Sequence, residues 1–109
     1  WKESWSVAVK HYAELDGEQM DSMSELATAL LQSKHMEGLF AITSMAQLRI
    51  SLYSTYPEWC AGRHIVIDPA ESGVNVRYFR NAKDPKPIEN HCEYDNATEV
   101  IANLCRDKL

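Results

Sequence analysis

The feature of this 109-residue chain that most limits its fold is a pair of β-branched runs on either side of a short loop. Residues 64–67 (HIVI) and 74–80 (VNVRYFR) flank the loop 68–73 (DPAESG). Val, Ile and aromatic residues favour extended backbone, whereas Pro and Gly favour the turn between two strands. The pattern predicts an antiparallel hairpin with Val74 and Val76 on one face of its second strand. An antiparallel sheet is therefore expected to form part of the fold.

The segment 39–54 allows two interpretations. Apolar residues at positions 48, 50 and 52 alternate with other residues, as in a half-buried strand, and Phe40 and Ile42 would belong to an earlier strand. A helix would instead gather Leu39, Ile42, Ala46, Ile50 and Tyr53 on one side. We favour the two strands, and we expect residues 81–87, which contain two prolines, to form a polar loop.

The start of the chain is also ambiguous. In residues 5–11, bulky Trp5, Val7 and Val9 alternate with small or polar residues, which is typical of a strand. The same region could place Trp1, Trp5, Ala8 and Tyr12 on one stripe of a helix. We favour the strand, followed by a turn at Asp16-Gly17.

Two segments have the features of amphipathic helices. Ser22 and Glu25 fit a capping box, and apolar residues follow at helical spacing until Gly38 ends the pattern. Asn96 and Glu99 repeat the capping pattern before the apolar stripe Val100, Ile101, Leu104 and Cys105. The sequence thus predicts one helix from Ser22 and a second that closes the chain.

Together these elements predict a single α+β domain over residues 1–109, in which an antiparallel sheet of about four or five strands packs against two helices. A chain of this length can bury roughly 65% of the surface that its unfolded form exposes. The expected core consists of Val7, Val9, Leu26, Leu30, Phe40, Ile42, Leu48, Ile50, Leu52, Ile65, Ile67, Val74, Val76, Ile101 and Leu104.

Charge is distributed unevenly along the chain. The net charge is −5, and residues 1–37 alone carry seven acids and three bases. Residues 63–88 carry five bases and three acids, and residues 89–99 carry four acids and no base. Such a balance argues against nucleic acid as a partner, because phosphate binding needs concentrated positive charge. We expect no membrane association either, because no apolar run approaches the roughly 20 residues that span a bilayer.

The cysteines point to a reducing environment. An odd number of cysteines, Cys60, Cys92 and Cys105, at wide spacing does not resemble a disulfide framework, so we expect a cytoplasmic protein. Cys60-x-x-x-His64 and His91-Cys92 could supply a zinc ligand set, but neighbouring residues of a strand point to opposite faces. We therefore expect no metal and no cofactor.

Catalytic motifs are not evident in the sequence. A cysteine nucleophile would need a nearby base, and no glycine-rich turn presents any of the thiols. The four glycines are widely separated, so no glycine-rich phosphate loop can form. We expect a protein that is not an enzyme.

Acidic and aromatic side chains are the candidate binding residues. The acidic stretch 14–26 (ELDGEQMDSMSEL) contains no base, and it is either a solvated turn or a surface for a basic partner. Aromatic residues around Pro57 would suit interface anchors, although core positions are the simpler explanation for most aromatics. The predicted partner-binding residues are Glu14, Asp16, Glu18, Asp21, Tyr56, Trp59, Glu89, Glu93 and Asp95.

The layout resembles that of immunity proteins of bacterial polymorphic toxin systems. The matching features are AELDGE, SMSELATALL, the FAITS…LRISLYS stretch and GVNVRYF, which together span much of the chain. The resemblance implies an inhibitor that is not an enzyme and that occludes a cognate toxin, often a basic nuclease or nucleic-acid deaminase. It carries no individual functional residue over to this chain.

Two other functions remain open. One is a small ligand-binding or enzymatic domain with a pocket between the sheet and the helices. The other is an interaction subunit of a larger assembly, in which Trp1 and Trp5 would belong to an exposed apolar patch.

Overall fold

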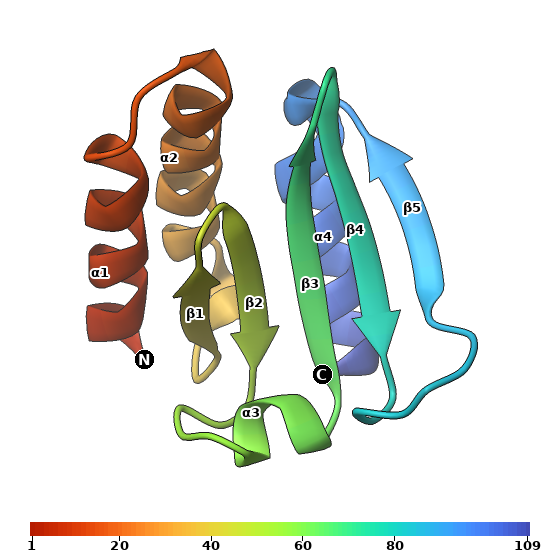
Figure 1. The fold of residues 1–109 in the computed structure, drawn as a ribbon. Coiled ribbons are helices and arrows are strands. Elements are labelled where there is room, and N and C mark those ends of the chain that lie inside the picture. The colour runs from red at the N-terminus through yellow and green to blue at the C-terminus, as the bar shows by residue number, and fades with distance from the viewer.

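The computed structural model describes all residues from Trp1 to Leu109 and has an α+β fold (Figure 1). Its helices are α1 (Lys2–Ala13), α2 (Glu18–Leu31), the short 3-10 helix η1 (Lys34–Met36), α3 (Glu58–Ala61) and α4 (Tyr94–Lys108). Its strands are β1 (Phe40–Ser44), β2 (Gln47–Ser51), β3 (His64–Ala70), β4 (Gly73–Phe79) and β5 (Ile88–Cys92). None of the helices combines the length and the apolar character that crossing a membrane requires.

The five strands form one antiparallel sheet in chain order, β1-β2-β3-β4-β5. Helices α1, α2 and α4 lie together on one face of this sheet, behind it in Figure 1. The opposite face carries no long helix, and we call it the open face. The predicted α+β fold with an antiparallel sheet of four or five strands is confirmed, but three long helices cover the sheet where two were expected.

The core lies between the sheet and the three long helices. Alternate strand residues such as Leu48, Ile67 and Val76 point toward the helices and are fully buried, as the period-two pattern predicts. Nine of the predicted core residues are buried: Leu26, Leu30, Leu48, Ile50, Ile65, Ile67, Val74, Val76 and Ile101. The others are less buried: Val7 is exposed, and Val9, Phe40, Ile42, Leu52 and Leu104 are half-buried.

The prediction of a strand at residues 5–11 is wrong. These residues belong to helix α1, whose buried stripe is Trp5, Ala8 and Tyr12. Three long-range hydrogen bonds hold this stripe on the sheet. The Trp5 indole donates to the Leu39 carbonyl (2.9 Å), the Tyr12 hydroxyl donates to the Ala46 carbonyl (2.9 Å), and Ser4 Oγ accepts from the Ala41 backbone N–H (3.0 Å). Tertiary packing therefore decides between two local patterns that the sequence supports almost equally.

Both predicted helices exist, but each begins before its expected cap: α2 begins four residues before Ser22, and α4 begins two residues before Asn96. Helix α2 starts at Glu18 after Gly17, whose φ of 113° suits glycine, and Ser22 lies in the second turn. Helix α4 starts at Tyr94 with Glu93 as its N-cap, and Asn96 lies in the first turn. Helix α2 ends at Leu31, well before Gly38, because Ser33 begins η1 by accepting a hydrogen bond from the His35 N–H.

The predicted strands of segment 39–54 and the hairpin of residues 64–80 are confirmed. The hairpin turn is tighter than expected, because residues 68–70 extend β3 and leave a two-residue turn before Gly73. A side chain at Gly73 would collide with the backbone of Cys92, and φ there is 94°. Pro69 is tolerated in β3 because pairing with β2 stops at Ile67, so its missing N–H has no strand to bond.

Candidate functional site

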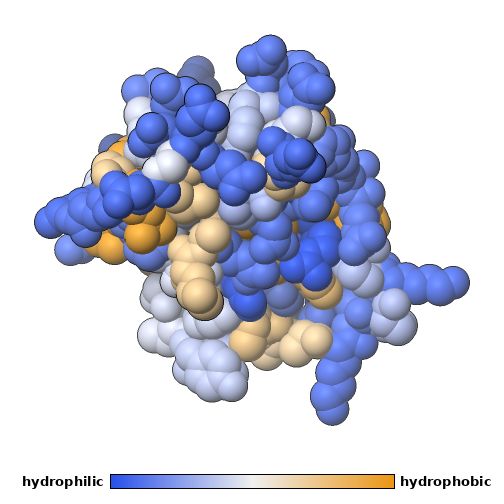
Figure 2. Space-filling model, turned by 45° about the horizontal axis from the view of Figure 1, so that its top comes forward, coloured by the Kyte–Doolittle hydropathy of each residue, from blue (hydrophilic) through white to orange (hydrophobic).

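One end of the molecule gathers most of its carboxylates, and we call it the acidic end. It is formed by the turn between α1 and α2, the first two turns of α2, the turn between β3 and β4, and the first two turns of α4, all near the top of Figure 1. Its exposed acidic residues are Glu14, Asp16, Glu18, Asp21, Glu25, Glu71, Glu93, Asp95 and Glu99. Hydrophilic side chains cover this end when it is turned toward the viewer (Figure 2).

The acidic end carries a large local excess of negative charge. Its nine acids are accompanied by one base, Lys10, whose ammonium lies 3.9 Å from the Glu14 carboxylate, and both side chains are largely exposed. Its net charge is therefore −8, whereas the rest of the chain has seven acids and ten bases, a net charge of +3. The overall charge of −5 conceals a strong separation of charge between the two parts.

Two shallow grooves divide the acidic end. The first, of about 400 Å³, lies between α2 and the turn between β3 and β4, and Glu18, Asp21, Glu25 and Glu71 line it. The second, of about 210 Å³, lies between α2 and α4 and includes Asp95. The Gln19 amide donates to the Ala70 carbonyl (2.8 Å) and so ties α2 to the hairpin. The carboxylates thus project from elements that are fixed relative to one another.

Tyr94 lines both grooves from the first turn of α4. Its hydroxyl is buried and makes no hydrogen bond, and burial raises its pKa. The hydroxyl therefore stays protonated at neutral pH, and its contribution to this end is a fixed, uncharged wall between the two grooves.

Helix geometry explains why so many acids can be tolerated together. Helices α2 and α4 both begin at this end, and Glu18, Asp21 and Asp95 lie in their first turns. The positive end of a helix dipole stabilises a carboxylate there by about 0.3–1 kcal/mol. Acids in the first turn of a helix therefore stabilise the helix itself, whether or not they also bind a partner. Glu71 lies in the turn between β3 and β4, outside any helix, and Asp16 lies just before the N-cap of α2.

The structure brings together six of the nine predicted binding residues and separates three. Glu14, Asp16, Glu18, Asp21, Glu93 and Asp95 share the acidic end. Glu89 lies on the open face of β5, opposite Arg77 of β4. Tyr56 lies just before α3 and Trp59 lies within it, at the end of β2 that is away from the acidic end. They therefore cannot anchor a partner that docks on the acidic end alone.

The predicted set of binding residues omits Glu25, Glu71 and Glu99, although Glu25 lies within the acidic stretch 14–26. The sequence contains a signal for Glu25, because Glu18, Asp21 and Glu25 recur at the spacing of one helix face. Glu71 is brought in by the hairpin and Glu99 by the direction of α4, and neither placement has a local signal in the sequence.

The cysteine and histidine candidates do not form a common site. Cys92 is buried on the helix-covered face, opposite Val74, while its neighbour His91 bonds Asn75 Oδ1 (2.8 Å) on the open face. The two side chains therefore point to opposite faces, as the strand geometry predicted. Burial raises the pKa of the Cys92 thiol and raises that of Cys105 to about 12, so both thiols stay protonated and weakly nucleophilic.

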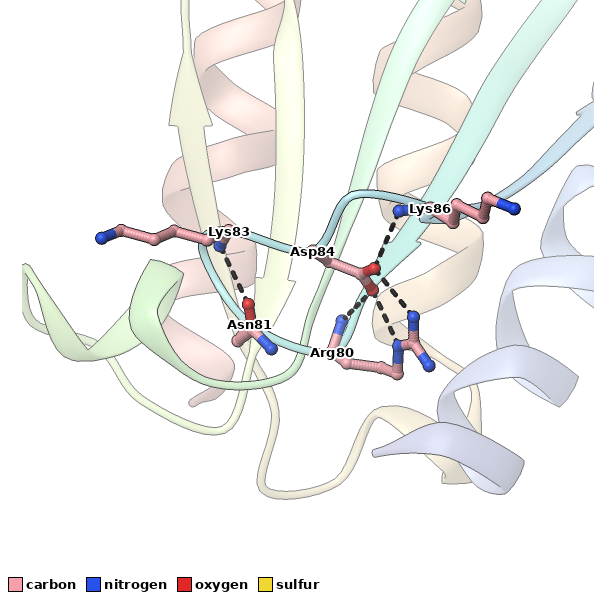
Figure 3. A network of polar contacts seen from close by, with 5 residues as sticks. All are labelled: Arg80, Asn81, Lys83, Asp84 and Lys86. Carbon is pink, nitrogen blue, oxygen red and sulfur yellow. Dashed lines mark hydrogen bonds and ion pairs between the residues drawn. The ribbon is translucent and has the colours of Figure 1, made fainter.

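The space between the sheet and the helices holds no ligand pocket, because the buried cluster around Trp5, Met23, Leu30 and Ile67 fills it. Hollows lie instead on the outer surfaces, including the open face. One of these hollows borders the loop that follows β4. In this loop Asp84 accepts hydrogen bonds from the Arg80 guanidinium, the Arg80 N–H and the Lys86 N–H (Figure 3).

Comparison of the chain with models of known protein families, with curated protein sequences and with solved structures finds no match.

Proposed function

We propose that this protein is an inhibitor that is not an enzyme and that binds a basic partner through its acidic end. The supporting observation is the convergence of two acidic segments, residues 14–25 and 93–99, which are far apart in the chain. Their carboxylates produce a local charge of −8 on a surface held by three packed elements. Surfaces of this kind speed association with a positively charged protein and fix its orientation.

The class of partner follows from the chemistry that such a surface can imitate. An enzyme that acts on nucleic acid needs a basic surface to bind the phosphates. A rigid group of carboxylates can occupy that surface and exclude the substrate. We therefore infer an immunity protein whose cognate toxin is a nuclease or a nucleic-acid deaminase, with binding in the cytoplasm.

A charge-reversal experiment tests the proposal. Asp16→Lys combined with Glu71→Lys changes two acids that lie outside the helices, so no residue within a helix is altered. Glu37→Lys combined with Glu89→Lys gives the same change in net charge away from the acidic end. Each tagged protein would be used to capture partners from the lysate of its native cell, eluted with a salt gradient and identified by mass spectrometry.

We expect the wild type and the control variant to retain the same basic protein and the acidic-end variant to lose it. The captured protein would then be purified, and its association rate would be measured at low and high salt. We also expect it to degrade or deaminate nucleic acid, and to lose this activity on addition of the wild type. A partner that binds both double variants equally, or that has no activity to inhibit, would contradict the proposal.

A further inference from the structure

The open face of the sheet contains a hollow of about 310 Å³ whose chemistry differs from that of the acidic end. Arg49 of β2, Val66 of β3 and Arg77 of β4 are direct neighbours across the strands and form its floor. His64 and Phe79 form one wall, with parallel rings whose centroids lie 5.0 Å apart. No carboxylate lines this hollow.

The two guanidinium groups are not equally neutralised. Arg77 is paired with Asp68 at 2.8 Å, but Arg49 takes part in none of the ion pairs of the structure. Arg49 donates two hydrogen bonds, through Nε and one terminal nitrogen, to the Gln47 amide oxygen (3.0 and 2.7 Å). Its other terminal nitrogen makes no hydrogen bond to the protein, and its guanidinium lies 4.9 Å from the Trp59 ring centre.

The neighbouring groups leave this positive charge uncompensated. His64 Nδ1 lies 2.9 Å from the Gly62 carbonyl, which can only accept, so Nδ1 carries the proton of the neutral ring. Burial lowers the pKa of His64, the hydrogen bond to Gly62 opposes this shift, and the nearby charge of Arg49 lowers the pKa further. Ala82 is the residue of the following loop that lines the hollow, and the Asp84 carboxylate of this loop is engaged by Arg80 and Lys86.

We propose that this hollow binds a small organic oxyanion, a carboxylate or a phosphate attached to a flat apolar group. The free edge of Arg49 supplies charge-assisted hydrogen bonds of the planar geometry that both oxyanions accept. Phe79 and Ala82, which are more exposed than Val66, offer apolar surface for the body of the ligand. The volume is at the lower limit of ligand sites, which are typically about 300–1,000 Å³, so the ligand is small. The proposal is independent of the partner of the acidic end.

Nuclear magnetic resonance titration tests this site directly. Benzoate and inorganic phosphate would be added separately to the ¹⁵N-labelled protein at neutral pH, and sodium chloride would keep the ionic strength constant. We expect saturable shifts of the backbone signals of Arg49, His64, Val66, Arg77 and Phe79 with at least one probe. Saturation with benzoate alone identifies a carboxylate site, and saturation with phosphate alone identifies a phosphate site. The absence of saturable shifts with both probes would overturn the proposal.

Two variants provide the matched comparison. Arg49→Gln should weaken binding of the active probe by roughly tenfold or more, because a charge-assisted hydrogen bond is lost. Arg63→Gln removes an exposed arginine that lies outside the hollow and should leave binding unchanged. If Arg49→Gln does not fold, Arg49→Lys keeps the charge without the planar fork and should also bind more weakly. Equal binding by the wild type and a folded Arg49 variant would refute the role of Arg49.

Discussion

At the scale of single residues, Asp84 is the clearest case of a polar side chain that organises its surroundings. Its side chain is almost completely buried, and its two oxygens accept from the Arg80 side chain and from two backbone N–H groups (Figure 3). These hydrogen bonds hold the pKa of Asp84 well below its usual range, and those from Arg80 have the largest effect. The ionised carboxylate therefore fixes the loop between β4 and β5.

This pKa shift predicts a pH-dependent loss of stability in Asp84→Asn. An acid whose pKa is lower in the folded state stabilises the fold fully above its unfolded pKa of about 3.9, and this contribution disappears as pH falls through the folded pKa. We expect urea to unfold the variant at a clearly lower concentration than the wild type at pH 7. The difference in free energy of unfolding should shrink progressively below about pH 4.

A surface ion pair serves as the control for Asp84. Asp107 is paired with Arg106, but both side chains are more than half exposed. Solvent screens such pairs, so Asp107→Asn should change stability much less than Asp84→Asn at pH 7. Equal effects of the two substitutions would mean that the Asp84 network adds little to the fold.

At the scale of elements, helix α1 is the part of the fold that the sequence predicted worst. Its residues satisfy both a strand pattern and a helical stripe, and only contacts with distant residues distinguish the two. The Trp5 indole reaches Leu39, and Tyr12 reaches Ala46, across more than thirty positions of the chain. Strand β5 also has a weak local signal, because four of its five residues are exposed on an edge.

The elements that the sequence predicted well are those whose pattern is set by burial on one face. The hairpin of β3 and β4 is the best example, since Ile65, Ile67, Val74 and Val76 all point to the helices. Helix boundaries were less predictable. A Ser or Asn near the start of a helix can cap it, but Gly17 and Glu93 occupy the cap positions in this fold.

The docking of α1 predicts contrasting effects for two of its residues. Trp5→Phe keeps most of the apolar surface but leaves the Leu39 carbonyl without its buried donor, at an expected cost of about 1–3 kcal/mol. Val7→Ala should cost less than about 0.5 kcal/mol, because Val7 is 59% exposed. Chemical denaturation followed by circular dichroism would measure both. A larger loss for Val7→Ala would instead favour the strand arrangement.

At the scale of the whole molecule, the acidic end is a property of topology. The charge pattern alone predicted two acidic segments that could bind a basic partner. Their meeting at one end depends on α2 and α4 both starting there, which no local pattern reveals. The same topology places Tyr56 and Trp59 elsewhere, so the predicted combination of acids and aromatic anchors does not form a single surface.

Repulsion among the carboxylates of the acidic end predicts that salt stabilises the free protein. Raising sodium chloride shortens the screening length from about 30 Å at 0.01 M to about 10 Å at 0.1 M, which weakens repulsion among exposed charges. We expect the midpoint of thermal unfolding to rise over this range. Asp16→Asn combined with Glu71→Gln should raise the midpoint at low salt and reduce its dependence on salt. Glu37→Gln is the control, and an equal response from it would place the repulsion elsewhere.

The order of the strands has a consequence for how quickly the protein acquires its fold. Every strand pairs with its neighbour in the chain, and no pairing needs a crossover connection. Hairpins of this kind form within about 1–10 μs, and folding rates rise as contacts become more local. The sheet can therefore assemble by successive addition of hairpins. Helix α1 contacts the first hairpin across some thirty residues of the chain. Its docking is therefore the step of the N-terminal half that loses the most chain entropy on loop closure.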